Sequence, residues 1–327
     1  MNRMSRGFPG HMAGLSLVEL MIALALGLVV SGAAIGVFLA NQQTYRSTES
    51  IGRIQESARV AFELMAREVR EAAGNACSRN LPVANVLENQ GQWWNQWQNG
   101  LLGYDNGALP ASVGGTDAIE VVSASSGGAP VAEMTANSAQ FKVSHAHDFV
   151  PNDILVVCDY TQASVFQATN VNAANVTIVH NTGTGTVGNC TKALGLPMPA
   201  SCPGGQPGNS AETYKIYGPG SQVVKLRASR WYVADNGRSG RSLYRVRMAQ
   251  GADQPAEEIT DGVEDLQLEY LVEGQSSYVA AAPGLDWSRV VAVRLRLTLA
   301  GAERVGTDGQ PLVRELQHVV NLRNRTA

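Results

Sequence analysis

This sequence of 327 residues lacks the common motifs for catalysis, phosphate binding and metal binding. It contains no nucleophile–base pattern, no phosphate-binding glycine loop, no HExxH and no CxxC or Cys/His zinc pattern. The formal net charge is only −3, so a broad nucleic-acid-binding surface is not expected. We therefore predict a protein that is not an enzyme, needs no cofactor or metal ion, and does not bind nucleic acid.

Proline is absent from residues 15–74, and charge is almost absent from residues 15–40, where Glu19 is the only ionisable residue. These 26 residues are long enough to cross a bilayer as a helix. Arg3 and Arg6 precede the run, so the positive-inside rule places the N-terminus in the cytoplasm and the rest of the chain outside it.

Two ordinary explanations of this apolar run are incomplete. A secretory signal should have an apolar core of about 7–15 residues that ends in an A-x-A-like site, and this run is longer and lacks the site. A plain membrane anchor explains the length but not Glu19, because a carboxylate at that depth costs about 2.5–3.5 kcal/mol on insertion scales. We therefore expect Glu19 to be functional and to have a partner.

After residue 40 the pattern becomes amphipathic, with charges on the remaining faces. The apolar positions recur at three- and four-residue steps, at Ile51, Ile54, Ala58, Phe62, Met65, Val69 and Ala72. Gly74 and Asn75 give a C-terminal stop signal. The pattern predicts one helix of about 60 residues, roughly 90 Å long. Its second half should pack on a globular domain, with a coiled coil as the alternative.

The sequence after Cys77 is rich in Gly, Asn, Ser and Thr, which favours turns and strands. Short apolar segments predict strands at 117–123, 139–145, 153–158 and 174–180. Clearer patterns predict strands at 223–233, 242–248, 266–272, 290–299 and 312–322, and Asp235-Asn236-Gly237 predicts a hairpin turn. We expect these strands to form an antiparallel sheet packed on the helix, which is an α+β fold.

The four cysteines are Cys77, Cys158, Cys190 and Cys202. An even number is compatible with two disulfides if the domain lies outside the cytoplasm, but four cysteines allow three connectivities. A bond between Cys190 and Cys202 would close a short Gly- and Pro-rich loop and leave Cys77 for Cys158. Four free thiols are the alternative.

Two further clusters are candidate binding sites. His145 and His147 would share one face of a strand, but no third ligand is identifiable, so we expect a polar strand end rather than a metal site. Trp93, Trp94 and Trp97 lie in a Gln/Asn-rich loop. Packing of this loop on the domain is the preferred interpretation, and an adhesive or partner-binding patch is the alternative.

Residues 14–21, GLSLVELM, resemble the class III leader of type IV pilins and pseudopilins. The resemblance implies that a prepilin peptidase cuts after Gly14 and N-methylates Leu15, where the family usually has Phe. Glu19 then takes the place of the acid at the fifth mature position. Such an acid can neutralise the new α-amino group of a neighbouring subunit, or its own. We therefore expect Glu19 to position the subunit in an assembling fibre.

Several C-terminal stretches are similar to PilW-type minor pilins, namely 262–270, 290–299 and 321–324, and so are 152–157 and 164–169. The resemblance implies a low-abundance subunit that helps to initiate type IV pilus assembly near the pilus tip. Its partners would be other minor pilins, the major pilin, prepilin peptidase and the inner-membrane assembly platform. A pseudopilin of a type II secretion system is the alternative, and a membrane-tethered periplasmic enzyme is disfavoured because no catalytic set is visible.

The expected organisation follows from these features. Residues 1–14 form a leader, 15–40 a transmembrane and assembly helix, 41–74 its amphipathic continuation, and 75–327 a β-rich periplasmic domain. The protein would be a single-pass protein of the bacterial inner membrane that is incorporated into a pilus. Met1 or Met4 is the preferred start, because initiation at Met12 would remove Arg3 and Arg6.

Overall fold

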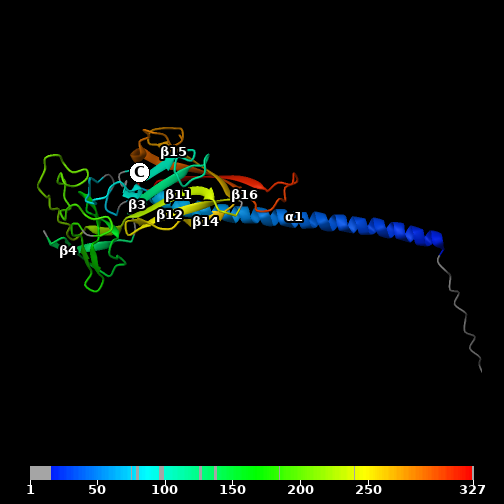
Figure 1. Ribbon diagram of the computed structural model, residues 1–327, viewed down its shortest axis with the longest axis horizontal. Coiled ribbons are helices and arrows are strands. Elements are labelled where there is room, and N and C mark those ends of the chain that lie inside the picture. The colour runs from blue at the N-terminus through cyan, green and yellow to red at the C-terminus, as the bar shows by residue number, and fades with distance from the viewer. Residues whose placement is uncertain are drawn as a thin grey trace, which may run out of the picture. The chain divides into compact units, whose positions relative to one another are not determined.

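The computed structural model describes residues 16–74, 76–78, 81–95, 99–124, 127–135, 138–183, 185–238 and 240–325. The chain divides into two compact units (Figure 1). The first contains Met1–Gly52 and Glu303–Leu312, and the second contains Arg53–Ala302 and Val313–Ala327. The helix α1 (Leu17–Glu71) contributes residues to both units.

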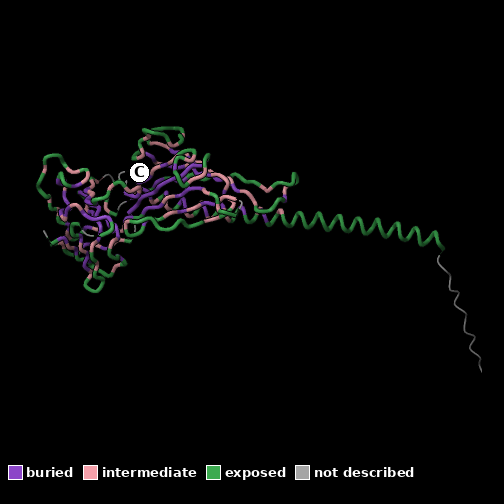
Figure 2. The backbone as a smooth tube through the Cα atoms, in the orientation of Figure 1, coloured by how far each residue is buried: buried purple, intermediate pink, exposed green. Residues whose placement is uncertain are grey.

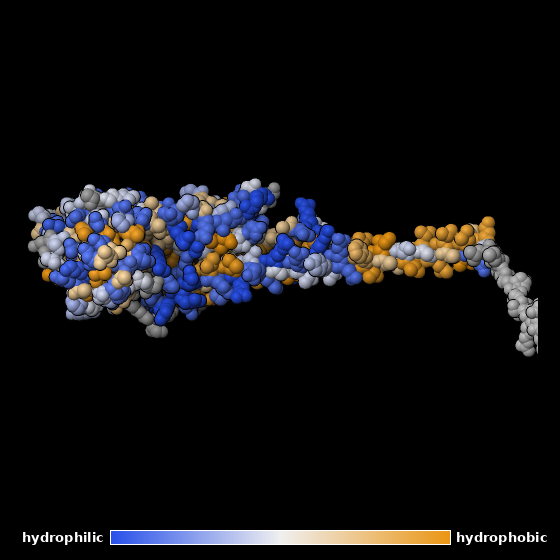
Figure 3. Space-filling view, turned by 90° about the horizontal axis from the view of Figure 1, so that it is seen from below, coloured by the Kyte–Doolittle hydropathy of each residue, from blue (hydrophilic) through white to orange (hydrophobic). Residues whose placement is uncertain are grey.

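The predicted long helix is confirmed, since α1 has 55 residues. Its first-unit part is exposed along the apolar run (Figure 2). Consecutive hydrophobic side chains are exposed there, so every face of the helix is apolar, and Figure 3 shows one of these faces. An 18-residue window of α1 has a mean hydropathy of 2.5, and none of this window is buried. The helix is therefore long and apolar enough to cross a membrane.

The second-unit part of α1 has one buried stripe. Its members recur at three- and four-residue steps and are Ile54, Ala58, Ala61, Met65, Val69 and Ala72. Phe62 lies beside this stripe, with its ring centroid 5.7 Å from that of His318 on β17 (Val313–Asn321). The prediction that this part packs on the globular domain is confirmed.

The largest sheet has eight strands and its own apolar core, which includes Phe141, Phe166 and Tyr217. The order is β1 (Val83–Asn85), β7 (Ala163–Gln167), β6 (Ile154–Cys158), β10 (Gln222–Lys225), β4 (Ala129–Thr135), β5 (Gln140–Val143), β9 (Thr177–Val179) and β8 (Asn170–Asn172). All of its neighbours pair antiparallel except β1 and β7, which are parallel.

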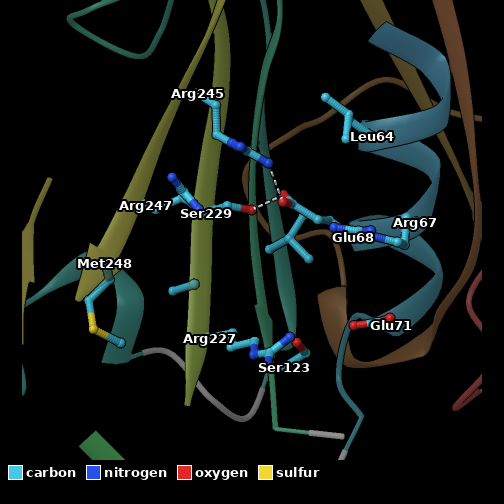
Figure 4. A pocket seen from close by; sticks show the side chains of 12 residues that line it. Leu64, Arg67, Glu68, Glu71, Ser123, Arg227, Ser229, Arg245, Arg247 and Met248 are labelled. Carbon is cyan, nitrogen blue, oxygen red and sulfur yellow. Dashed lines mark hydrogen bonds and ion pairs between the residues drawn. The ribbon is translucent and has the colours of Figure 1, made fainter. Parts of the chain in front are cut away.

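The second sheet has six strands, and it lies next to α1 (Figure 4). Its order is β13 (Ala252–Asp253), β12 (Arg241–Ala249), β11 (Arg227–Asp235), β3 (Ala118–Ser123) and β2 (Leu101–Tyr104), and β14 (Glu257–Asp261) also pairs with β12. The third sheet contains β15 (Val263–Val272), β16 (Val290–Ala300) and β17. Two short 3-10 helices are η1 (Trp93–Asn95) and η2 (Trp287–Arg289).

The α+β prediction is confirmed, but the expected single sheet and one expected strand were wrong. The segment 223–233 forms two strands, β10 and β11, which belong to different sheets. The break is at Leu226, whose N–H donates to the carbonyl of Ile154 at 2.9 Å. Leu226 is itself buried, so the apolar pattern stays continuous across the change of sheet. The hairpin predicted at Asp235-Asn236-Gly237 does connect β11 to β12.

Candidate functional site

The N-terminal end of α1 carries the predicted processing and assembly residues. Gly14 and Leu15 lie outside the described residues. Glu19 lies in the first turn, where its Oε2 accepts a hydrogen bond from the backbone N–H of Ser16 at 2.9 Å. The backbone N–H of Glu19 in turn donates to Ser16 Oγ at 3.2 Å. This reciprocal pair is a capping box, which satisfies amide groups at the start of the helix.

The capping box is a function of Ser16 and Glu19 that the sequence reasoning missed. Its signal was present, because a Ser three residues before a Glu, ahead of an apolar run, is the capping-box pattern. Glu19 was interpreted only as a charge that neutralises an amino group. A test of that role must therefore separate the charge of Glu19 from its capping hydrogen bond.

The C-terminal end of α1 is held by backbone and side-chain groups from distant parts of the chain. Arg323 N–H donates to the carbonyl of Arg70 at 3.0 Å, and Asn324 Nδ2 donates to the carbonyls of Glu71 and Ala72 at 3.2 and 3.3 Å. These carbonyls belong to the last turn, where intrahelical partners run out. The segment 321–324, singled out from the sequence only by resemblance, thus caps the helix.

Both candidate disulfides are formed. Cys77 is bonded to Cys158 with a Cα–Cα distance of 5.9 Å, and Cys190 to Cys202 with a Cα–Cα distance of 5.3 Å. The first bond links the segment after α1 to the end of β6. The second closes a loop beside the core of the eight-stranded sheet. The alternative of four free thiols was wrong.

The contact between α1 and the six-stranded sheet is centred on Glu68. Its Oε2 accepts hydrogen bonds from the Ser229 hydroxyl and from Trp231 Nε1, the latter at 2.6 Å. Its Oε1 accepts from Arg245 Nη1 at 2.9 Å. The bonds to Ser229 and Arg245 are dashed in Figure 4, where Glu68 extends from the helix toward the strands.

The strand register explains why these three donors converge. Ser229 and Trp231 are two residues apart on β11, so their side chains share one face of the sheet. Arg245 on β12 is the register partner of Trp231, and its side chain lies on that same face. The Arg245 guanidinium lies 5.2 Å from the centroid of the Trp231 ring and also pairs with Glu257 at 2.8 Å. The hydrogen bond from Arg245 lowers the pKa of Glu257.

The sequence reasoning also missed Glu68, although a signal was available. Ala61, Met65, Glu68 and Ala72 follow the four- and three-residue steps of one helix face, and the other three members are fully or nearly fully buried. An acid within an apolar stripe predicts a specific partner, because an unpaired buried carboxylate is costly.

A pocket of about 500 Å³ lies beside Glu68, between α1 and the strands β3, β11 and β12. Its charged lining residues are Arg67, Glu68, Glu71, Arg227, Arg245 and Arg247. Its apolar lining residues include Leu64, Val121 and Met248. Figure 4 shows charged and apolar side chains on both sides of the pocket, with Arg67 and Leu64 on the helix and Arg227 and Met248 on the sheet.

A second buried carboxyl, Asp117, joins the loop before β3 to β15. Its Oδ1 accepts from the N–H of Asn106 at 2.9 Å and its Oδ2 from the N–H of Leu268 at 2.7 Å. Burial raises the pKa of Asp117 to about 6, despite these two hydrogen bonds. Asp117 is therefore a structural group that titrates in the mildly acid range.

The tryptophan and histidine clusters behave mainly as structural groups. Trp94 is fully buried, and Trp93 donates its indole N–H to Asp253 at 2.8 Å, which agrees with packing of the loop; Trp97 lies outside the described residues. His145 and His147 lie just beyond the end of β5, which agrees with the expected polar strand end and not with a shared strand face. No cluster of three or more metal-binding side chains occurs among the residues that the structure describes.

Comparison with known proteins supports the resemblance seen in the C-terminal sequence. Residues 230–322, from β11 to just beyond β17, match the family model of PilW, the type IV pilus-assembly protein W. Among solved structures, the chain is similar to a type IV-like pilin from Thermus thermophilus, with 11% identity and a TM-score of 0.34. That alignment covers 84% of this chain and 98% of the other. No match was found among curated proteins.

Proposed function

We propose that this protein is a minor pilin that acts in the initiation of type IV pilus assembly, near the pilus tip. The observation that carries the proposal is a PilW-type region, residues 230–322, in the same chain as an exposed apolar helix that begins with Glu19 in its first turn. A helix with hydrophobic side chains on all faces needs either lipid or other helices as its surroundings. A pilin subunit uses both in turn, first in the membrane and then in the fibre.

The proposed processing and topology follow from the leader-like sequence. Prepilin peptidase cuts after Gly14 and methylates Leu15, and the first-unit part of α1 then spans the inner membrane with the β-rich unit in the periplasm. The partners are the other minor pilins, the major pilin and the inner-membrane assembly platform. The role is structural rather than enzymatic.

Glu19 is proposed to neutralise the α-amino group of a neighbouring subunit during incorporation. Three substitutions separate this role from capping. Glu19→Gln removes the charge but keeps an oxygen that can accept the Ser16 N–H, because Gln also completes a capping box. Ser16→Ala removes the hydroxyl that caps the helix but leaves the charge, and Glu19→Ala removes both.

We expect all three variants to be cleaved normally, as judged by the mass of the membrane-extracted protein. Glu19→Gln and Glu19→Ala should both lose incorporation into sheared pili, whereas Ser16→Ala should retain it. Equal defects in Ser16→Ala and Glu19→Gln would show that capping, not charge, is the requirement. A Gly14→Val variant should remain uncleaved and supplies the unprocessed reference.

A pseudopilin of a type II secretion system is the second candidate, because it would share the chemistry of the N-terminal segment. The PilW match favours the pilus. Deletion of the gene distinguishes the two. We expect loss of surface pili and of twitching with normal protein secretion, and the reverse phenotype would refute the minor pilin proposal.

A further inference from the structure

The pocket between α1 and the six-stranded sheet contains arginines that the fold does not use. Arg245 is paired with Glu68 and Glu257, and Arg247 lies 3.5 Å from the same Glu257 carboxylate. The side chains of Arg67 and Arg227, by contrast, have no ion pair or hydrogen bond within the described parts of the chain, although both line the pocket. Their guanidinium groups are therefore available to a ligand.

The two free arginines belong to opposite walls. Arg67 is on α1 and Arg227 begins β11, and Figure 4 shows them on the two sides of the pocket. A guanidinium binds a carboxylate through two parallel N–H donors. Glu71 lines the same pocket, so one carboxylate from a ligand would neutralise the net positive charge of the two unpaired arginines and Glu71.

The rest of the lining indicates what carries that carboxylate. The apolar residues Leu64, Val121 and Met248 also line the pocket, the first on α1 and the other two on the sheet. A glutamate side chain has an aliphatic stem that can pack on such apolar residues while its carboxylate reaches the arginines. An inorganic anion such as phosphate would make no contact of this kind. The volume, about 500 Å³, accommodates a few side chains of an extended segment.

We propose that this pocket binds an acidic peptide segment of a neighbouring pilus subunit, with Arg67 and Arg227 as the residues that recognise its carboxylate. The identity of the partner as a pilus subunit rests on the proposed function, whereas the recognition of an acidic peptide does not. The pocket borders α1, the helix proposed to assemble the fibre. A subunit that packs along α1 can therefore reach it.

The test uses the full-length protein in detergent micelles and isothermal titration calorimetry. The probes are a short peptide with two central glutamates, the same peptide with glutamines, inorganic phosphate, and vesicles that contain phosphatidylglycerol. The pocket variant is Arg67→Gln with Arg227→Gln. The matched control is Arg304→Gln with Arg314→Gln, which makes the same charge change at exposed arginines outside the pocket.

We expect the glutamate peptide to bind the wild type and the control equally, and the pocket variant at least about tenfold more weakly. The glutamine peptide should not bind, and higher salt should weaken the interaction. Equal binding to the pocket variant, tighter binding of phosphate or vesicles than of the peptide, or no binding of the glutamate peptide would each overturn the proposal.

A second measurement separates this inference from the proposed function. The pocket variant, expressed in a deletion strain, should give fewer pili than the control variant. Normal piliation by the pocket variant would overturn the assignment of the partner to a pilus subunit and leave the minor pilin role intact. Normal piliation of the deletion strain itself would instead refute the minor pilin role.

Discussion

The hydrogen bonds of Glu68 are expected to make a large contribution to the stability of the second unit. The change that tests this is Glu68→Ala. It removes the acceptor of three donors at once, namely the Ser229 hydroxyl, the Trp231 indole N–H and the Arg245 guanidinium. Trp231 is fully buried, and the Arg245 side chain is only 9% exposed, so water cannot readily replace the carboxylate.

The magnitude follows from what each donor loses. Leaving one buried neutral donor unsatisfied costs about 1–3 kcal/mol, and removing one partner of a buried ion pair costs about 3–5 kcal/mol. Two features reduce the sum. The Glu68 side chain is 20% exposed to solvent, and Arg245 retains its bond to Glu257 in the variant. We therefore expect Glu68→Ala to lower the free energy of unfolding by about 2–4 kcal/mol.

The measurement is urea unfolding of the full-length protein in detergent micelles, followed by tryptophan fluorescence, to which the buried Trp231 contributes as one of five tryptophans. The matched control is Glu63→Ala on the same helix. Glu63 pairs with Arg59 at 2.9 Å, but both side chains are about two-thirds exposed, at 66% and 69%. An exposed pair of this kind contributes about 0.5 kcal/mol or less. If Glu68→Ala costs no more than Glu63→Ala, the role assigned to Glu68 is refuted.

Two further predictions concern the buried acid and the disulfides. Because the pKa of Asp117 is about 6 when folded and 3.8 when unfolded, the folded state holds the extra proton between these values, and stability should fall by up to about 3 kcal/mol as pH rises through this window. Asp117→Asn should abolish that component, and an unchanged slope in urea unfolding across this pH range would contradict it. Replacing Cys77 and Cys158 by Ala should lower the free energy of unfolding by about 4.5 kcal/mol, because their bond spans 81 residues. Replacing Cys190 and Cys202 should lower it by about 3 kcal/mol, because their bond spans only 12 residues. Equal unfolding free energies with and without these bonds would rule out the entropic contribution.

The features predicted well from the sequence depend on local patterns. The long helix follows from an uninterrupted, proline-free run with apolar periodicity, and its observed bounds lie within a few residues of the prediction. The hairpin at Asp235-Asn236-Gly237 follows from turn chemistry, which acts over a few residues. The short loop between Cys190 and Cys202 favoured one of the three possible disulfide pairings. The structure selects this pairing, because it places Cys77 next to Cys158.

The features missed depend on contacts between distant segments. The chain passes from β10 to β11 within one apolar run. The strands before and after Leu226 are both partly buried, although they belong to different sheets, so the hydrophobic pattern does not mark the break. The partners of Glu68 lie more than 150 residues along the chain, and only the register of β11 and β12 brings them together. Hydrophobic periodicity identifies which face of α1 is buried, but it does not identify the strand that covers this face.

The PilW-type match also has a structural meaning, because it coincides with the part of the chain that holds α1. Trp231 and Arg245, which bind Glu68, and His318, which contacts Phe62, all lie within residues 230–322, and the helix-capping Arg323 and Asn324 follow directly. The eight-stranded sheet, from β1 to β10, lies wholly outside the match and has its own core and the disulfide Cys190–Cys202. Its strands β6 and β7 also share a second apolar core with Val122, Ala228 and Met248 of the six-stranded sheet. The PilW-type match therefore covers several contacts that fix the C-terminal part of α1, and it does not extend to the eight-stranded sheet that packs on the matched region.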